Sequence, residues 1–232
     1  KKNREALALT LAEIHQIELD FIQAAHRVQQ AGADGVQLHA AHSYLLSRFI
    51  DTTFNQRTDA YGGSAAKRFR IVENIIMGIQ AACGRDFPIF IKINSDTKTD
   101  NAAYEQDLLY MLGRMKELGI ELVELSGVDF INQPRDGHLY YLERAGRLRA
   151  AVDMPMSLVG GVRSLHDMEQ VLAAGLDMVS LGRPLIAEPD FIPKSLAGQE
   201  KSKCVSCCRC FVIPHMHPGV RCVLRRPRKA KG

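Results

Sequence analysis

Five of the six cysteines lie within the last thirty residues, and their spacing is suited to metal binding. The pattern is Cys204-x2-Cys207-x2-Cys210-x11-Cys222, with Cys208 inside it. Three closely spaced thiolates and a fourth one a short loop away can converge on one centre. Thiolates bind both iron–sulfur clusters and structural zinc. The spacing therefore predicts a metal centre, and it leaves open which of the two metals is bound.

A disulfide framework is the alternative reading of these cysteines. No secretory signal is visible, which favours a reducing, cytoplasmic setting. No apolar run is long enough to cross a bilayer, so no membrane partner is expected. The net charge is +4, and much of it falls in the basic stretch after Cys222. Since no aromatic-rich surface accompanies that stretch, a solvated terminus is favoured over nucleic-acid binding.

A second group of residues could support acid–base or hydrogen-bonding chemistry. His39 and His42 lie three positions apart at the end of a predicted strand, and Tyr44 follows them. Taken alone, such histidines could be a hydrogen-bonded structural pair, and the tyrosine could simply pack. Lys92 lies in the apolar run from Pro88 to Asn94. A charge in a buried strand is costly without a partner, which favours a ligand beside it.

Glycines end the last two predicted strands. Gly160 and Gly161 follow one strand, and Gly182 with Arg183 follows the next. Backbone N–H groups, a helix N-terminus and an arginine together form a phosphate cradle. Glycines are also common at strand ends for steric reasons alone.

Alternating helix and strand signals position these groups. Thr10 and Glu13 form a capping box, and Ser164 with Asp167 forms another. Helices are expected from Thr10 to Gly32, 65–82, 102–118, 140–152 and from Ser164 to about Gly175, and strands at 35–39, 88–94, 120–125, 156–159 and 178–181. Such alternation predicts an α/β fold with a parallel sheet. Five strands are too few for a closed eight-stranded barrel, so either the sheet is open or this is the back portion of a barrel.

The connection from Ala40 to Ser64 is unusually long, and loops of this length inside βα units are usually functional. The stretch Asp34-Gly-Val-Gln-Leu-His-Ala-Ala-His-Ser-Tyr-Leu-Leu46, which leads into this connection, resembles the old yellow enzyme family, and the resemblance continues with Asn55-Gln-Arg-Thr-Asp-Ala-Tyr-Gly-Gly-Ser64. Gly160-Gly161-Val162 and Leu181-Gly-Arg-Pro-Leu-Ile-Ala-Glu-Pro-Asp190 match as well. The tail cysteines are similar to those of the family's iron–sulfur branch, typified by 2,4-dienoyl-CoA reductase.

The resemblance implies a TIM (β/α)8 barrel of which this chain holds the last five βα units. Residues 1–200 would be the C-terminal portion of an FMN-binding barrel, and 201–232 a Cys-rich cluster-binding segment. The implied function is an NAD(P)H-dependent, FMN-containing oxidoreductase that reduces an activated C=C bond of an unsaturated carbonyl or enoyl substrate.

Roles for individual residues follow from the resemblance. His39 and His42 would donate hydrogen bonds to the substrate oxygen, and Tyr44 would deliver a proton to the α-carbon. Lys92 stands where the family usually has an arginine beside the flavin. The remaining roles are FMN-phosphate binding by Gly160, Gly161, Gly182 and Arg183, and [4Fe–4S] ligation by Cys204, Cys207, Cys210 and Cys222. Cys208 would be unligated, and the residues from Asn55 to Arg68 that match the family would be architectural.

Three departures from the iron–sulfur branch are visible. Ser126-Gly127 is not followed by the branch's histidine, the third cysteine gap is one residue shorter, and the chain stops ten residues after Cys222. A missing FAD- and NAD(P)-binding domain is therefore one expectation. Homo-oligomers are another, because a five-stranded portion would expose two sheet edges. A non-catalytic barrel fragment with a structural zinc site is the alternative function.

Overall fold

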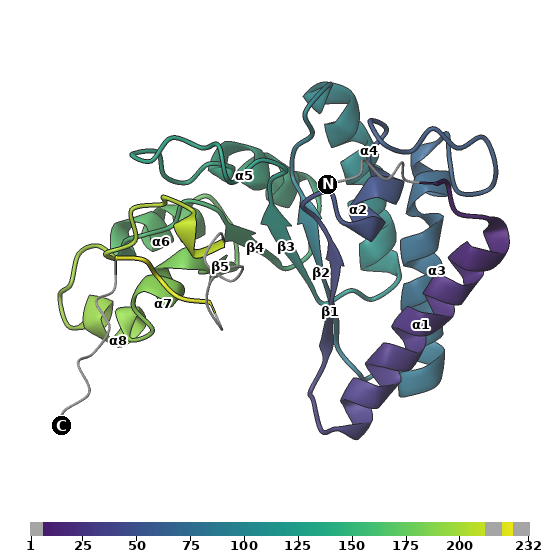
Figure 1. The fold of residues 1–232 in the computed structure, drawn as a ribbon, viewed down its shortest axis with the longest axis horizontal. Coiled ribbons are helices and arrows are strands. Elements are labelled where there is room, and N and C mark those ends of the chain that lie inside the picture. Colours follow the sequence, from purple (N-terminus) through teal and green to yellow (C-terminus); the bar gives the residue numbers. More distant parts are fainter. Residues whose placement is uncertain (1–6, 212–219, 225–232) are drawn as a thin grey trace. The chain divides into compact units, whose positions relative to one another are not determined.

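The computed structural model describes residues 7–211 and 220–224, so the basic stretch from 225 onward lies outside the described residues. Helices and strands alternate along the described chain (Figure 1). The strands are β1 (Val36–Ala40), β2 (Ile89–Asn94), β3 (Leu122–Ser126), β4 (Met156–Val159) and β5 (Met178–Ser180). The helices are α1 (Leu11–Gln30), α2 (Leu45–Ile50), α3 (Ala65–Cys83), α4 (Asn101–Glu117), α5 (Leu142–Ala151), α6 (Leu165–Ala173), α7 (Arg183–Ala187), α8 (Phe191–Leu196) and the 3₁₀ turn η1 (Arg209–Phe211).

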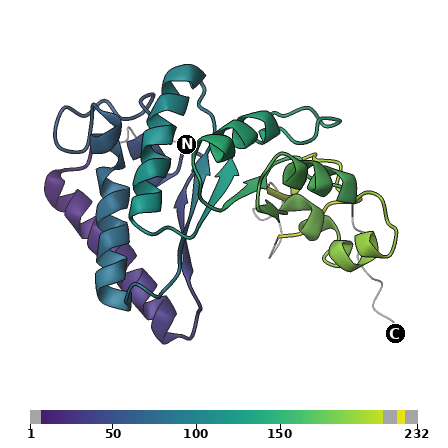
Figure 2. The ribbon, with the colours of Figure 1, turned by 180° about the vertical axis from the view of Figure 1, so that it is seen from behind.

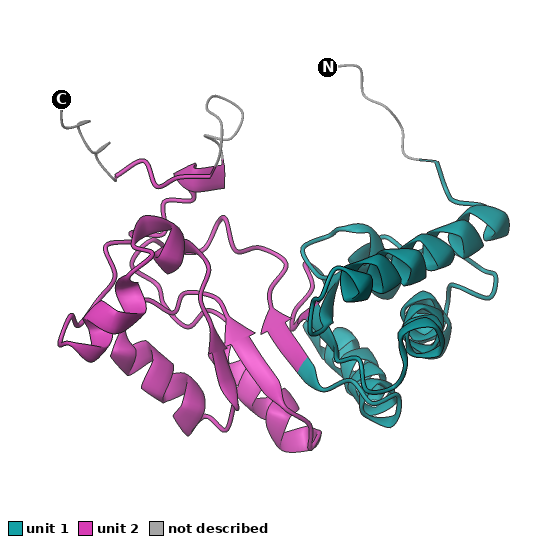
Figure 3. Ribbon diagram, turned by 90° about the horizontal axis from the view of Figure 1, so that it is seen from below, with its two compact units in different colours: residues 1–92, 99–122 teal, residues 93–98, 123–232 magenta. Residues whose placement is uncertain are grey.

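The five strands form one sheet in the order β1-β2-β3-β4-β5. β3 pairs in parallel with β4, with Val123 opposite Met156, and β4 pairs in parallel with β5, with Leu158 opposite Val179. The fully buried residues of β2 and β3 include Ile91, Ile93, Val123 and Leu125, as expected for strands that are covered by helices on a parallel sheet. The chain divides into two compact units (Figure 3): 1–92 with 99–122, and 93–98 with 123–232.

The first unit contains α1 to α4, β1 and most of β2. The capping box of Thr10 and Glu13 is confirmed at the start of α1. α1 and α3 lie side by side in both views of the ribbon (Figures 1 and 2). The buried residues of α1 are Ile14, Glu18 and Ala25, whereas Val28 near the end of the helix is 40% exposed.

Glu18 explains why the buried face of α1 differs from the apolar pattern. Its carboxylate accepts hydrogen bonds from the Tyr61 hydroxyl at 3.0 Å and from the Asn74 amide at 2.8 Å. A buried carboxylate is tolerated when such donors satisfy it. These bonds attach the segment before α3 to α1 and α3.

The second unit contains β3 to β5, the last two residues of β2, and α5 to η1. The capping box of Ser164 and Asp167 is confirmed at the start of α6. Its core includes Leu125, Leu148, Leu158 and Phe191, all with no solvent exposure. None of the described helices has the length and apolar character needed to cross a membrane.

The connection from Ala40 to Ser64 is not entirely loop. It contains the six-residue helix α2, whose Leu46, Phe49 and Ile50 are buried. A helix of one and a half turns carries too few repeats for its period to stand out in the sequence. The same reason applies to α7, α8 and η1, which the sequence pattern did not predict.

Candidate active site and cysteine pocket

The first unit brings His39, His42 and Tyr44 together. His39 is the fourth residue of β1, His42 follows the strand, and Tyr44 is the N-cap residue of α2. The ring centroid of His39 lies 5.2 Å from that of His42 and 5.2 Å from that of Tyr44. The Tyr44 side chain is 62% exposed, so its hydroxyl can reach a ligand.

The turn after β1 adopts an uncommon backbone conformation. His42 has φ of 60° and Ser43 has φ of 59°. Two consecutive non-glycine residues in the left-handed region are rare, and such conformations concentrate at functional sites. The Ser43 carbonyl accepts a hydrogen bond of 2.8 Å from Arg48 Nε, which holds the turn against α2.

The electrostatics of this turn keep His42 uncharged at neutral pH. Burial lowers the pKa of His42 to about 4, and the positive charges of Lys92 and His39 contribute to the same shift. A neutral imidazole has one N–H donor and one acceptor nitrogen. The charge of Lys92 therefore acts directly on His42 within the first unit.

Residues after this turn form a scaffold. Arg57 makes two hydrogen bonds to the Asp59 carboxylate and a third to the Leu9 carbonyl. The buried Asn55 amide donates to the Phe49 and Tyr61 carbonyls, both at 2.7 Å. The guanidinium of buried Arg68 donates to backbone carbonyls and to Asp107. Every one of these donors is used within the fold, so the architectural role expected for this loop is confirmed.

In the second unit, Gly160 and Gly161 follow β4 with φ of 141° and 75°. A Cβ at Gly160 would lie 2.6 Å from the Tyr141 ring, and one at Gly161 would lie 2.7 Å from the Leu139 nitrogen. Close packing by the segment 138–141 is thus enough to explain both glycines. Gly182 differs, because a Cβ there would meet nothing within 4 Å.

Arg183 begins α7 and contacts the Cys-rich segment. Its Nη1 donates a hydrogen bond to the Cys208 Sγ at 2.8 Å, and its guanidinium lies 6.0 Å from the Phe130 ring centroid. Burial alone would lower the pKa of Arg183, but the Cys208 sulfur and the Tyr140 hydroxyl hold it above the ordinary value. The sequence pattern gave no sign that Cys208 and Arg183 would be partners.

The Cys-rich segment is fixed to the second unit by further contacts. Phe211 packs edge-on against Phe130, with ring centroids 5.5 Å apart. The Lys203 nitrogen donates to the buried Glu188 carboxylate. The segment therefore does not form a core of its own and is held on α7 and the segment after β3.

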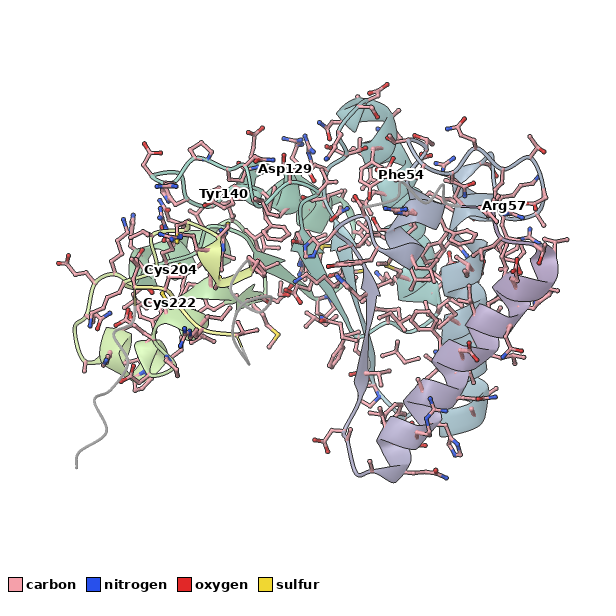
Figure 4. The ribbon with its side chains drawn as sticks, in the orientation of Figure 1. Phe54, Arg57, Asp129, Tyr140, Cys204 and Cys222 are labelled. Carbon is pink, nitrogen blue, oxygen red and sulfur yellow. The ribbon has the colours of Figure 1, made fainter. Side chains whose placement is uncertain are left out.

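The cysteines in the tail segment gather around one narrow pocket in the second unit. Its lining includes Cys204, Cys207, Cys208, Cys210 and Cys222 (Figure 4 labels the first and last). All six cysteines of the chain are free thiols, and burial raises the pKa of Cys204 and Cys210. Within the described residues, no three His, Cys, Asp or Glu side chains are placed to hold one metal ion. Much of the loop between Cys210 and Cys222 lies outside those residues.

The structure also reveals residues that the sequence pattern did not single out. Tyr141 is 5% exposed, and its hydroxyl has no hydrogen-bond partner among the described residues. Asp96, just after β2, accepts a hydrogen bond of 2.7 Å from the Val128 nitrogen, and burial raises the pKa of its carboxyl group. In the sequence, the one sign of a special role was the adjacent pair Tyr140 and Tyr141 before α5. Such a pair is also common where tyrosines simply pack in the core.

Comparison with known proteins identifies the family. Residues 1–202 match the NADH:flavin oxidoreductase / NADH oxidase family. The chain is 32% identical over 210 residues to an NADH oxidase from Thermoanaerobacter brockii, covering 86% of this chain and 32% of the relative. It is 30% identical over 185 residues to an NADPH dehydrogenase from Bacillus subtilis strain 168, covering 79% of this chain and 54% of the relative.

A solved structure, the old yellow enzyme homologue from Zymomonas mobilis, superposes with a TM-score of 0.72 at 26% identity, over 85% of this chain and 56% of that one. The five-stranded α/β fold thus corresponds to part of an old yellow enzyme-like TIM barrel, as expected. The chain spans about a third to a little over half of the length of these relatives. By sequence and by fold, the chain belongs to the NADH:flavin oxidoreductase / NADH oxidase family.

Proposed function

We propose that this chain is part of an FMN-dependent oxidoreductase that uses NAD(P)H to reduce an activated C=C bond of an unsaturated carbonyl compound. The observation that carries the proposal is the grouping of His39, His42 and Tyr44 at the carboxyl end of β1. Active sites of α/β barrels are built at this end of the strands. Family membership supports the flavin and the nicotinamide reductant.

The residues of the chain are suited to holding a flavin. Lys92 on β2 and Arg183 at the start of α7 are cations, and each can balance a phosphate or a reduced flavin ring. The open space beside Gly182 leaves room for an anion, whereas the glycines after β4 are already packed against their own chain. Bound FMN would supply hydride to the β-carbon of the substrate.

The histidines would act on the substrate oxygen. A neutral imidazole N–H donates a hydrogen bond to a carbonyl and stabilises the negative charge that develops on it. His42 is held neutral by burial and by Lys92, so it is suited to this role without being charged itself. His39 is exposed beside it and supplies a second ring nitrogen.

Tyr44 would complete the addition. Its exposed phenol donates a proton to the α-carbon while the hydride reaches the β-carbon, so that two hydrogens add across the double bond and NAD(P)H is oxidised to NAD(P)⁺. General acids placed in this way typically contribute 10²- to 10⁴-fold to the rate.

Two half-reactions measured separately test the proposal in the complete protein. We expect an absorbance band near that of oxidised flavin, bleaching on addition of NADH or NADPH, and return of the band when cyclohex-2-enone is added without oxygen. If the purified protein binds no flavin and holds stoichiometric zinc instead, the chain belongs to a non-catalytic barrel fragment.

We also propose that the cysteine pocket holds a [4Fe–4S] cluster with Cys204, Cys207, Cys210 and Cys222 as ligands. The support is that all four line one pocket. The thiols would have to close in on the metal, since the described residues have no ready-made ligand set. Metal binding often drives such ordering.

Iron and sulfide analysis after anaerobic purification tests the cluster. We expect about four iron atoms per chain, retained in Cys208→Ala and lost in Cys222→Ala. Stoichiometric zinc without iron would refute the cluster, and loss of the metal in Cys208→Ala would refute the ligand assignment.

A further inference from the structure

A second pocket in the second unit has no role in the chemistry described so far. It has a volume of about 160 Å³ and lies between the residue after β2 and the start of α5. The lining residues are Ser95, Tyr140, Tyr141, Glu143, Arg144 and Arg147. Ser95 follows the carboxyl end of β2, the end of a parallel sheet at which ligands bind in open and closed α/β folds.

Two phenol groups in this lining are unsatisfied. The hydroxyls of Tyr140 and Tyr141 are buried and have no hydrogen-bond partner among the described residues. Leaving one buried hydroxyl unpaired costs about 1–3 kcal/mol. Buried polar groups in native proteins almost always have a partner, and exceptions call for an explanation. A bound ligand would supply the missing partner for both hydroxyls.

The fold holds the Tyr141 ring in place. A Cβ on Gly127 would lie 2.0 Å from the ring, and a Cβ on Gly160 would lie 2.6 Å from its other edge. Gly127 follows β3 and Gly160 follows β4, so the ring lies over the carboxyl ends of two adjacent strands. The Tyr140 ring contacts it edge-on, with the centroids 6.0 Å apart. The hydroxyl positions are therefore fixed by packing rather than by a hydrogen bond.

The charges around the pocket decide which kind of ligand fits. Burial raises the pKa of Tyr141, and the carboxylates of Asp96 and Asp129 add to the shift, so the phenol stays protonated and acts as a donor. Burial also raises the pKa of the Asp96 carboxyl group, while the Val128 nitrogen and Arg144 oppose that shift. A ligand that meets two fixed phenol donors must present acceptor atoms, such as the oxygens of a carboxylate.

Two arginines add positive charge to the pocket wall. Arg144 donates from Nη1 to the Ser95 carbonyl at 3.3 Å, which places its guanidinium beside the end of β2. Arg147 pairs with Glu143 at 2.7 Å, and the Glu143 side chain is 92% exposed, so this acid faces solvent. Positive charge and phenol donors together favour an anionic acceptor over a neutral one.

We propose that this pocket binds the carboxylate of a small, flat organic acid. The phenols of Tyr140 and Tyr141 donate to the carboxylate oxygens, and their rings pack against the body of the acid. The arginines balance its charge. The proposal concerns the second unit only and does not depend on flavin binding or on the chemistry of His39, His42 and Tyr44.

Fluorine NMR of this chain with 4-fluorobenzoate tests the proposal, with 4-fluorobenzamide as the uncharged analogue. We expect saturable binding of the acid and binding of the amide that is weaker by about tenfold or more. Tyr141→Phe should weaken binding of the acid by about tenfold or more, since a hydrogen bond to a charged group is removed. Tyr110→Phe, a change on the exposed side of α4, should leave binding unchanged.

Thermal melting separates loss of binding from loss of structure. Tyr141→Phe removes a hydroxyl that has no hydrogen-bond partner among the described residues, so the melting temperature of this variant should equal or exceed that of the original chain. If it fails to fold, Tyr140→Phe takes its place in the binding measurement. The proposal is overturned if the acid does not bind up to its solubility limit, if the amide binds equally well, or if the folded tyrosine variant binds the acid with unchanged affinity.

Discussion

Functional residues were expected both in the turn after β1 and at the strand ends that lead to the Cys-rich segment. The two regions differ in how far apart in sequence the contacting residues lie. In the first unit, His39, His42 and Tyr44 lie within six positions and remain neighbours in space. In the second unit, Arg183 contacts Cys208, which lies 25 positions further along the chain. Residues close in sequence are brought together by one local turn, whereas partners distant in sequence are chosen by packing that no spacing rule reveals.

The two regions also differ in how their side-chain hydrogen-bond donors are used. In the first unit the scaffold residues satisfy one another, which leaves the exposed Tyr44 outside the scaffold's bonds. In the second unit Arg183 donates a hydrogen bond to the Cys208 sulfur, and we propose that the same residue also binds a phosphate. An arginine has five N–H donors, and a single one binds Cys208 at 2.8 Å. The contact with sulfur therefore narrows the directions from which a phosphate can be bound, but it does not use up the arginine.

The largest effect is expected from Tyr44→Phe in the complete, flavin-loaded protein. Removing the hydroxyl removes the proposed proton donor, so reduction of an unsaturated ketone should slow by about 10²- to 10⁴-fold. Reduction of the flavin by NAD(P)H does not need that proton and should change little. Stopped-flow absorbance of the two half-reactions measures both rates.

Tyr110→Phe is the matched control, since Tyr110 is 44% exposed on α4. Its half-reactions should be unchanged. Equal slowing of both half-reactions by Tyr44→Phe would mean that this residue supports the flavin site as a whole. The turn after β1 would then have a structural role, like the scaffold residues that follow it.

A smaller effect is expected at Arg183, which contacts the Cys208 sulfur and is proposed to bind the FMN phosphate. Arg183→Gln should weaken FMN binding by about 10- to 100-fold, because a charge-assisted contact to phosphate is replaced by a neutral one. Cys208→Ala removes only the sulfur partner and should change FMN affinity by less than about threefold. Flavin fluorescence titration gives both dissociation constants, and Lys194→Gln on α8 is the control for the loss of a positive charge.

Two other results would change the interpretation of this region. Unchanged FMN affinity in Arg183→Gln would show that Arg183 fixes the Cys-rich segment and takes no part in phosphate binding. Clearly tighter FMN binding in Cys208→Ala would show that sulfur and phosphate compete for the same guanidinium.

The parts of the molecule that could be predicted from sequence are those set by local rules. The capping boxes at Thr10 and Ser164, the helices behind them and the apolar strand around Ile91 all follow from neighbouring residues, and the structure confirms them. The burial of Glu18 could not be predicted in this way, because its partner Tyr61 lies 43 positions away. The pairing of Arg183 with Cys208 and the unsatisfied hydroxyl of Tyr141 likewise depend on how distant segments pack.

The smallest effect should be seen in the dependence of stability on pH, and it isolates the environment of His42. The pKa of His42 falls from an ordinary value of 6.5 to about 4 in the folded chain, through burial and through the charges of Lys92 and His39. The unfolded chain therefore takes up a proton near pH 6.5 while the folded chain does not. Below that pH, protonation stabilises the unfolded state relative to the folded state. The contribution of His42 to stability is therefore present above pH 6.5 and is lost as the pH falls toward 4. Because His42 is only partly buried, we expect a loss of about 1–2 kcal/mol rather than the full value of the shift.

Urea unfolding at pH 7 and pH 4.5 measures this loss. The difference in unfolding free energy between the two pH values should be smaller in His42→Gln than in the original chain, whereas His166→Gln, on the exposed side of α6, should leave that difference unchanged. An identical pH dependence in the original chain and in His42→Gln would mean that His42 is solvated in the folded protein, and that the turn after β1 is no more enclosed than the strand ends of the second unit.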